Sequence, residues 1–389
     1  MGVARLATLR VGLNLTFLGE RAGGVGRYAQ ELAAALAARE DIELHVVASR
    51  DLPAEVRTAD WAARARWTTL PISAASPRRH LAGQFALLPA LALAHRWDVL
   101  HSPANAGPVL VPGVACVITM HDVIWLDAPE QWGTPEAVRA MHRTAIPTVR
   151  RATLVLAGSH TAARALVRGL HLDPARIVVA AHGVHGPAPT TLLTPEPELR
   201  RRLDLGAGPV VLCVAQKRPY KNQEALVRAL AQLARQDVRL VLPGSSTEYE
   251  RQLREIATAY AVQERVVFVD WVDDADLEGL YGLARCVALP SRHEGFGLPV
   301  LEAMVRGVPV ACSSIEVLRE VAGGAALLFD PDDDTTLASS LGRLLDDDAL
   351  RADLARRGRE RAAAFTWEAT ADATVRAYAQ ARDRSPPSG

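Results

Sequence analysis

Lysine is almost absent from this chain of 389 residues, whose formal net charge is zero. Only Lys217 and Lys221 are lysines, and every other need for positive charge is met by arginine. The balance of 44 basic against 44 acidic residues argues against a dedicated nucleic-acid-binding protein, because such a protein is basic overall. We therefore expect no nucleic-acid partner.

Cysteine is also scarce, and no long hydrophobic run is present. The four cysteines are Cys116, Cys213, Cys286 and Cys312. They lie far apart in apolar, strand-like runs, so we expect small buried side chains rather than disulfides or a zinc site. No apolar run approaches the roughly 20 residues that a membrane span needs. Arg5 and Arg10 interrupt the apolar N-terminal stretch, which is therefore unlike a secretory signal. A soluble, cytoplasmic protein is expected.

The length and the hydrophobic content of 49% favour two domains with full cores. Short apolar runs alternate with helical patterns in both halves, which predicts parallel sheets covered on both faces. The Pro- and Thr-rich segment 187–197 (PAPTTLLTPEP) is typical of a linker. We predict an α/β fold of two doubly wound, Rossmann-like domains, residues 1–188 and 198–365, facing each other across a cleft.

The elements expected in each half are these. Strands are predicted at Val11–Leu15, Leu44–Ala48, Val99–His101, Cys116–Met120, Leu154–Ala157 and Ile177–Val179, and then at Val210–Val214, Arg239–Leu242, Val266–Val269, Cys286–Leu289, Val310–Ala311 and Ala326–Phe329. Two acidic triplets, Asp332–Asp334 and Asp346–Asp348, are interpreted as helix caps or turns rather than as metal ligands.

The strongest motif is the segment 289–314, LPSRHEGFGLPVLEAMVRGVPVACSS. A strand ends near Pro290, and a glycine-containing loop leads into a helix with Pro299 near its first position. Such a loop presents backbone N–H groups at the positive end of a helix, which suits a diphosphate or sugar hydroxyls. Glu294 in the loop and Glu302 in the helix can serve different parts of one ligand. The alternative is structural: Glu302 as a helix-dipole partner and the glycines as turn residues.

The pattern E-G-F-G-L-P-x-x-E, followed by A-x-x-x-G-x-P-V, resembles the donor-binding signature of retaining glycosyltransferase family 4, which has the GT-B fold. The resemblance implies that Glu294 and the backbone of Phe296, Gly297 and Leu298 contact the transferred sugar. It implies that Glu302 holds the ribose hydroxyls of a nucleoside-diphosphate sugar. It also implies that the segment 366–389 begins with a helix that packs back on the N-terminal domain.

Two weaker motifs in the first half follow the same family in order. Gly23 and Gly24 lie between a strand and a helix, where any tight turn favours glycine. They resemble the family loop that approaches the donor phosphate and the acceptor. His121 follows the strand ending at Met120, and a buried structural histidine is the alternative interpretation. In the family a histidine at this point contacts the sugar near the reaction centre.

The two lysines fall in one loop, V-A-Q-K-R-P-Y-K-N, which resembles the family loop V-G-x-x-x-x-x-K-N. A compact ammonium group is favoured there, because arginine serves everywhere else. The resemblance makes Lys221 the better-matched diphosphate ligand. The chain has Ala215-Gln216 where many members of the family have Gly-Arg, so the second phosphate cation is either Lys217 or Arg218.

The sequence therefore predicts a retaining glycosyltransferase that transfers a sugar from a nucleoside-diphosphate sugar to an acceptor hydroxyl. His121 and Glu294 are the predicted catalytic residues, and no metal or other cofactor is expected. The sequence leaves three classes of acceptor: the hydroxyl of a glycan, of a lipid-linked acceptor or of a natural product. Two other functions are weighed: a sugar-nucleotide isomerase of the 2-epimerase type, and a non-catalytic sugar-nucleotide-binding subunit.

Basic residues are in excess in the first half, where residues 1–186 hold 19 arginines against 14 acidic residues. The relevant residues include Arg78, Arg79, His80, Arg139, Arg143, Arg150 and Arg151. Such a surface attracts an anionic bilayer, although ordinary solvated helix faces give the same pattern. Peripheral contact with the inner face of the membrane stays an open alternative.

Overall fold

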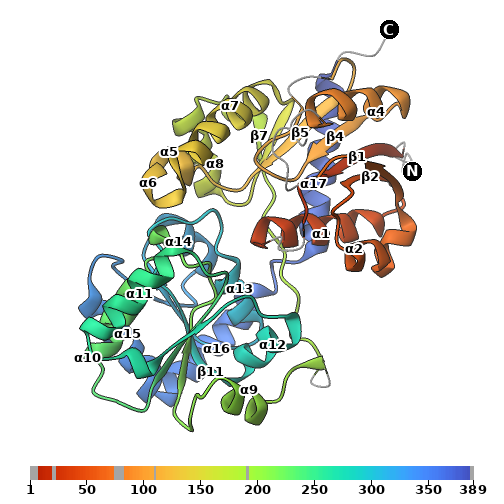
Figure 1. The fold of residues 1–389 in the computed structure, drawn as a ribbon. Helices are drawn as coiled ribbons and strands as arrows, with labels where there is room; N and C mark the ends of the chain where they lie inside the picture. The colour runs from red at the N-terminus through yellow and green to blue at the C-terminus, as the bar shows by residue number, and fades with distance from the viewer. Residues whose placement is uncertain (1–7, 20–22, 74–82, 109–110, 190–191, 386–389) are drawn as a thin grey trace. The chain divides into compact units, whose positions relative to one another are not determined.

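The computed structural model describes residues 8–19, 23–73, 83–108, 111–189 and 192–385. The chain divides into two compact units. Unit 1 comprises Met1–Asp127, Thr134–Gly183 and Thr366–Gly389, and unit 2 comprises Ala128–Gly133 and Val184–Phe365. Each unit contains one parallel sheet with helices packed on it (Figure 1). The predicted α/β fold with two Rossmann-like sheets is confirmed.

The sheet of unit 1 has seven parallel strands among the described residues, in the order β3-β2-β1-β4-β5-β6-β7. They are β1 (Leu9–Leu15), β2 (Ile42–Ser49), β3 (Arg66–Leu70), β4 (Val99–Ser102), β5 (Ala115–Met120), β6 (Leu154–Ala157) and β7 (Ile177–Val179). The central strands are buried along almost their whole length, as continuous apolar runs require. The polar edge strand β3 was not predicted, because its sequence RWTTL carries no apolar run.

The main helices of unit 1 are α1 (Gly23–Ala37), α2 (Ala54–Thr58), α4 (Leu88–Ala94), α5 (Ile124–Asp127), α7 (Pro135–Arg151), α8 (His160–Leu170) and α17 (Trp367–Arg384). The last of these, α17, packs against α1 and the strands β4 to β7. Its Trp367 and Tyr378 are buried in the same core cluster as β1 and β2. Helix α17 therefore completes the core of unit 1, and Figure 1 shows it beside the strands of that unit.

Among the residues that the structure describes, the sheet of unit 2 has six parallel strands in the order β10-β9-β8-β11-β12-β13. They are β8 (Val210–Leu212), β9 (Arg239–Pro243), β10 (Val266–Val269), β11 (Ala284–Leu289), β12 (Val310–Ser313) and β13 (Leu327–Phe329). The helices are α6 (Pro129–Trp132), α9 (Glu196–Arg202), α10 (Gln223–Gln232), α11 (Glu248–Ala259), α12 (Asp274–Leu283), α13 (Leu298–Val305), α14 (Glu316–Ala322), α15 (Asp334–Asp346) and α16 (Asp348–Ala362).

In both sheets the direction in which successive strands are added reverses next to the first strand. In unit 2 the chain builds outward from β8 through β9 to β10, and then returns to place β11 on the other side of β8. Ligands of doubly wound sheets bind at such a switch point, beyond the carboxyl ends of the strands. The loops after β8 and β11 carry Lys221 and Glu294, so the topology brings these two segments side by side.

The acidic triplets and the cysteines have the structural roles that the sequence predicted. Asp333 accepts hydrogen bonds from two backbone N–H groups at the start of α15, and Asp347 accepts one from the Leu350 N–H at the start of α16. All four cysteines are buried and free. Burial raises the pKa of the Cys213 thiol to about 12, which leaves it protonated and unreactive at neutral pH.

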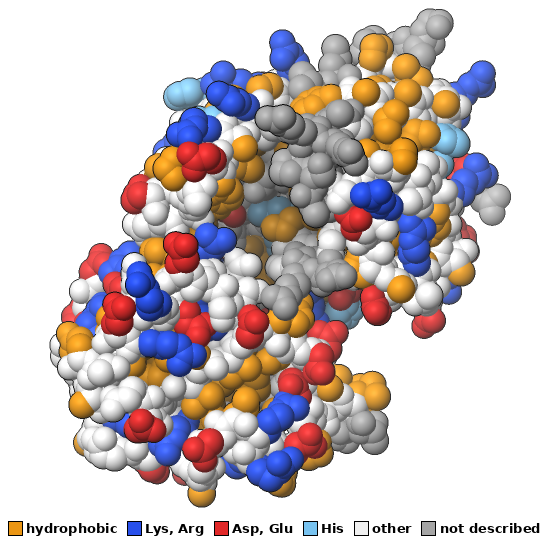
Figure 2. All heavy atoms as spheres, viewed as in Figure 1, with side chains coloured by type: hydrophobic (Ala, Val, Ile, Leu, Met, Phe, Trp, Pro, Cys, Tyr) orange, Lys and Arg blue, Asp and Glu red, His pale blue; other side chains and the backbone are white. Residues whose placement is uncertain are grey.

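No described helix is both long and apolar enough for a membrane crossing. On the face shown in Figure 2, basic and acidic side chains are interspersed over unit 2, in keeping with the balanced composition. The membrane-facing segment suggested for Arg78, Arg79 and His80 lies outside the described residues. The four arginines suggested on α7, including Arg139 and Arg150, are exposed.

Candidate active site

A buried ion pair lies at the switch point of unit 2. The Lys221 ammonium Nζ donates to the Glu294 carboxylate Oε1 over 2.7 Å, and the two side chains are only 15% and 8% exposed. The Ser291 hydroxyl donates to the same oxygen over 2.8 Å. Burial alone would lower the pKa of Lys221, but the Glu294 charge outweighs it and raises that pKa. Lys221 therefore keeps its positive charge at neutral pH.

Asn222, the residue after Lys221, ties the surrounding loops together. It is fully buried and adopts a left-handed backbone conformation with φ 54°. Its amide Nδ2 donates to the carbonyl oxygens of Pro290 and Pro331 over 3.2 and 2.9 Å, and its Oδ1 accepts from Arg292 over 2.5 Å. One buried amide thus joins the loops after β8, β11 and β13, and this fixes the backbone that presents Lys221.

The start of α13 has the geometry expected of the glycine loop. Gly297 caps the helix with φ 102°, and an added Cβ would lie 2.5 Å from Leu318. Both facts require glycine there. Phe296 is buried, with its ring centroid 6.0 Å from that of Phe365, so the loop is anchored from inside. Leu298 begins the helix, and its N–H is one of those that a helix start leaves without a helical partner. Pro299 has no N–H, and the Val300 N–H donates to the Gly297 carbonyl oxygen over 3.0 Å.

Glu302 lies further along α13 and is held by a neighbouring helix. The Tyr281 hydroxyl on α12 donates to Glu302 Oε2 over 2.8 Å. Arg306 donates to the Glu302 carbonyl oxygen over 2.8 Å and to Glu278 Oε2 over 2.9 Å. The guanidinium of Arg306 also lies 4.9 Å from the Tyr281 ring centroid. Glu302 is therefore a carboxylate in a fixed setting rather than a freely rotating surface group.

Lys217 is turned inward. Its side chain is fully buried, and Nζ donates to the carbonyl oxygens of Gly244 and Val269 over 2.5 and 2.8 Å. Glu250 lies 3.5 Å away, while burial lowers the Lys217 pKa. This lysine joins the carboxyl ends of β9 and β10, and its ammonium is engaged by the protein itself.

Arg218, the other candidate for the second phosphate cation, is half-buried. Its Nη1 donates to the carbonyl oxygen of Trp132 in α6 over 3.2 Å. A guanidinium carries five N–H donors, so this one bond does not exhaust its capacity. Of the two candidates, Arg218 is the one whose cationic group is not enclosed in the interior.

The sequence-predicted residues of unit 1 lie at the start of α1 and after β5. Gly23 and Gly24 are the first two residues of α1, and Gly23 has φ 51°. A Cβ added at either position would meet no atom of the described residues within 4 Å. The backbone there is open to close approach by a ligand, as a glycine turn at a helix start allows.

His121 follows β5 and is 7% exposed. Its Nε2 lies 3.0 Å from the carbonyl oxygen of Pro103, so this nitrogen carries the proton. Burial lowers the His121 pKa to about 4, in spite of the bond to Pro103. His121 is consequently neutral at pH 7. Its ring meets the Tyr28 ring edge-on at 4.9 Å between centroids, and the His182 ring at 5.4 Å.

Tyr28 belongs to a buried chain of hydrogen bonds that the sequence did not reveal. Its hydroxyl lies 3.1 Å from the Thr119 hydroxyl, and Thr119 lies 2.9 Å from Nε2 of His101. Nδ1 of His101 lies 2.6 Å from the Tyr378 hydroxyl on α17. Burial lowers the His101 pKa to about 3, so this imidazole is neutral and donates through one nitrogen only. The chain links α17 to the ring that contacts His121.

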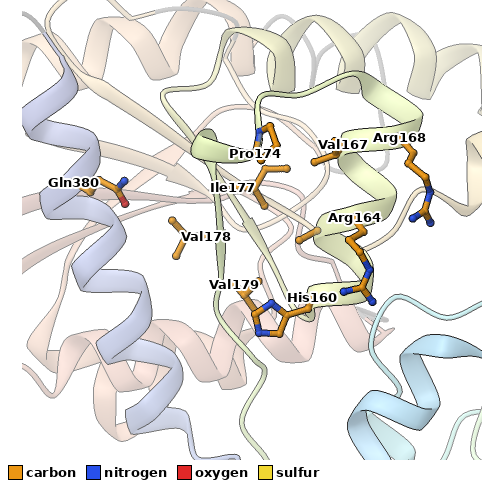
Figure 3. Close-up of a pocket in the computed structure, with 10 residues that line it drawn as sticks. His160, Arg164, Val167, Arg168, Pro174, Ile177, Val178, Val179 and Gln380 are labelled. Atoms are coloured by element: carbon orange, nitrogen blue, oxygen red, sulfur yellow. The ribbon is translucent and has the colours of Figure 1, made fainter.

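The described residues contain no cluster of three or more His, Cys, Asp or Glu side chains that could hold a metal ion. A groove of about 840 Å³ lies in unit 1 between α8, β7 and α17. Figure 3 shows His160, Arg164 and Arg168 along α8 beside Ile177 and Val178 of β7. None of the residues assigned above lines it, so the groove is separate from the candidate site.

Two family models match this chain. The model "Glycosyltransferase Family 4" matches residues 22–185, and the model "Glycosyl transferases group 1" matches residues 196–361. The D-inositol 3-phosphate glycosyltransferase of Acidothermus cellulolyticus is 31% identical over 392 residues, covering 92% of this chain and 86% of that protein. The O-antigen chain mannosyltransferase B of Escherichia coli is 30% identical over 268 residues, covering 67% and 69%.

Solved structures share the fold. Sucrose-phosphate synthase from Thermosynechococcus elongatus superposes with a TM-score of 0.75 at 24% identity, over 96% of this chain and 98% of that one. The HepE protein of Anabaena, in complex with UDP and glucose, gives a TM-score of 0.74 at 21% identity over 96% and 100%. At these identities the likeness establishes the fold.

Proposed function

Because the chain belongs to glycosyltransferase family 4, the glycosyl transferases group 1, we propose that it is a retaining, metal-independent glycosyltransferase. Family membership makes it a glycosyltransferase with a nucleotide-sugar donor. The observation that carries the finer proposal is the buried pair of Lys221 and Glu294 beside the N-terminus of α13. It places a cation and an anion close to the start of a helix in unit 2.

In the proposed reaction the bond between the anomeric carbon of the sugar and the diphosphate oxygen breaks. The acceptor oxygen forms its bond to that carbon on the same face. The acceptor hydroxyl proton passes to the departing diphosphate, so atoms and charges balance. Lys221 and the N–H groups at the start of α13 stabilise the negative charge that develops on the leaving group.

Glu294 and His121 orient the sugar in this proposal. Glu294 provides a carboxylate held by Lys221 and Ser291, which can accept hydrogen bonds from sugar hydroxyls and offset developing positive charge. His121 is neutral, and its Nε2 proton is directed to Pro103. Gly23 and Gly24 would let the donor phosphate approach the backbone at α1.

Arg218 is the proposed second diphosphate ligand, because the Lys217 ammonium already serves two carbonyl oxygens in the interior. No metal or other cofactor is needed in this scheme, since cations and helix amides take over the charge stabilisation. Phe296, Gly297 and Leu298 shape the sugar pocket, and Glu302 takes the ribose hydroxyls.

The first experiment is a ligand screen that follows thermal stability with GDP-, UDP-, dTDP- and ADP-sugars. A ligand that binds the folded state raises the melting temperature. With the donor identified, Glu302→Ala should raise the donor KM, whereas Glu294→Ala and His121→Ala should lower kcat. The anomeric configuration of the product, read by NMR, tests retention. Wild-type turnover in all three variants would refute the site.

Product analysis with donor and no acceptor separates the transferase from an isomerase, because an isomerase converts the donor alone. Slow donor hydrolysis without acceptor would also exclude a non-catalytic subunit. The printed names of the relatives suggest two acceptors to begin with: an O-antigen-type mannosyl glycan and D-inositol 3-phosphate. Flotation with anionic vesicles tests whether the exposed arginines of α7 bring the protein to a membrane.

A further inference from the structure

Tyr281 is the one described side chain whose hydroxyl reaches the Glu302 carboxylate by a hydrogen bond that the structure resolves, at 2.8 Å to Oε2. Tyr281 is 1% exposed, so its hydroxyl is removed from bulk water and Glu302 satisfies it as an acceptor. The bond joins α12 to α13, which are separate elements of unit 2. It restricts rotation of a carboxylate that a flexible glutamate side chain would otherwise leave mobile.

The Tyr281 ring is itself held in place. Arg306 lies over the ring at 4.9 Å from its centroid, and it donates to Glu278 Oε2 over 2.9 Å. Arg306 also donates to the backbone carbonyl oxygen of Glu302. Burial would lower the Arg306 pKa, but the Glu278 carboxylate raises it. The arrangement fixes both the backbone and the carboxylate of Glu302 through a single aromatic ring and its cation.

We propose that Tyr281 is a positioning residue, which orients the Glu302 carboxylate so that it accepts hydrogen bonds from the ribose hydroxyls of the donor. The inference rests on the proposed function, in which Glu302 binds the ribose. A carboxylate aimed in advance loses little freedom when the ligand arrives, so binding is tighter and more selective for hydroxyl-bearing nucleotides. Tyr281 contributes to this selectivity without touching the ligand.

The test compares two ligands and four proteins by calorimetric titration. The ligands are the tighter-binding of UDP and GDP, and its 2′,3′-dideoxy counterpart. The proteins are the wild type, Glu302→Gln, Tyr281→Phe and Tyr249→Phe. Tyr249 is the matched control, because its buried hydroxyl donates to Glu224 over 2.9 Å in the same unit. Both Tyr→Phe changes keep the ring and remove one Tyr–Glu hydrogen bond.

We expect the wild type to prefer the ribonucleotide and Glu302→Gln to lose this preference. Tyr281→Phe should weaken the affinity for the ribonucleotide by about three- to tenfold, which is part of the full value of a charged hydrogen bond. It should leave the affinity for the dideoxy compound unchanged. Tyr249→Phe should change neither affinity. With the intact donor, Tyr281→Phe should raise KM at constant kcat.

Two results separate the inference from the function on which it rests. In the first, Glu302→Gln abolishes the preference for the ribonucleotide, while Tyr281→Phe keeps it at the wild-type level or lowers the affinity for both ligands equally. Tyr281 then has only a structural role. If Glu302→Gln keeps the full preference, Glu302 does not bind ribose, and the proposed donor site fails together with the inference.

Discussion

Replacing Glu294 by glutamine should destabilise the protein and yet strengthen its affinity for a nucleoside diphosphate. The substitution keeps the shape of the side chain and removes the anion that neutralises Lys221 over 2.7 Å. Breaking a buried ion pair by removing one partner costs about 3–5 kcal/mol. Because Lys221 is 15% exposed and water can reach its ammonium group, we expect a loss of about 2–3 kcal/mol in unfolding free energy.

The same unpaired ammonium group becomes a better partner for an incoming phosphate. In the proposed complex of the wild type the diphosphate shares Lys221 with Glu294, whereas in Glu294→Gln it no longer competes with that carboxylate. We expect a gain of about tenfold in affinity, which corresponds to roughly 1.4 kcal/mol. This is less than the energy lost when the Lys221–Glu294 ion pair is broken. Turnover should fall, since Glu294 no longer orients the sugar.

Urea denaturation measures the stability, calorimetric titration of UDP and GDP measures the affinity, and initial rates measure turnover. Glu196→Gln is the control, because the Glu196–Arg200 pair is solvent-exposed on α9 and should be worth less than about 1 kcal/mol. Adding Lys221→Met to Glu294→Gln should restore part of the lost stability. If Glu294→Gln keeps wild-type stability, or binds the diphosphate more weakly, the pair does not compete with the ligand as argued.

Three further predictions concern Lys217, the buried histidines of unit 1 and the proposed independence from metal ions. Lys217→Met should lower the unfolding free energy by about 1–3 kcal/mol, because the carbonyl oxygens of Gly244 and Val269 lose their donor. It should leave the affinity for UDP and GDP within twofold, whereas Arg218→Ala should weaken that affinity. If titrations show that both variants weaken it equally, Lys217 is a phosphate ligand after all. Acid should destabilise unit 1, because His101 and His121 have folded-state pKa values of about 3 and 4, below the usual 6.5, so the unfolded chain takes up protons first. Stability is lost as pH falls from about 6.5 toward 4, by up to about 3 kcal/mol for each histidine. Urea melts between pH 7.5 and 5 that coincide would contradict this. EDTA at millimolar concentration should leave turnover unchanged. Loss of turnover in EDTA that a divalent cation restores would refute metal independence.

The sheets were largely predictable from the sequence, because buried parallel strands are continuous apolar runs. The strand predicted at Leu154–Ala157 agrees with β6 at both ends, and the one at Val266–Val269 agrees with β10. The edge strand β3 escaped prediction because its RWTTL sequence is half-exposed. The segment 187–197 was interpreted as a linker, and α9 begins within it at Glu196, where proline and acidic residues are also typical of a helix start.

The candidate site was predictable only where neighbours are set by topology. Lys221 and Glu294 follow strands that flank the switch point, so their proximity could be expected from the fold, and the ion pair agrees with it. The partners of His121 and Glu302 could not be foreseen. Tyr28 and Tyr281 reach them from helices whose rotation about the sheet depends on packing that no local pattern encodes.

Helix α17 has a consequence for how the protein is made. Its Trp367 and Tyr378 fill the core of unit 1, whose first strand is translated more than three hundred residues earlier. Unit 2 is complete once Phe365 leaves the ribosome, whereas the sheet of unit 1 must wait with an uncovered apolar face. The nascent N-terminal half is thus exposed to aggregation and chaperone capture for most of synthesis. The docking of α17 therefore completes the core of unit 1 only after the strands of unit 2 have been made.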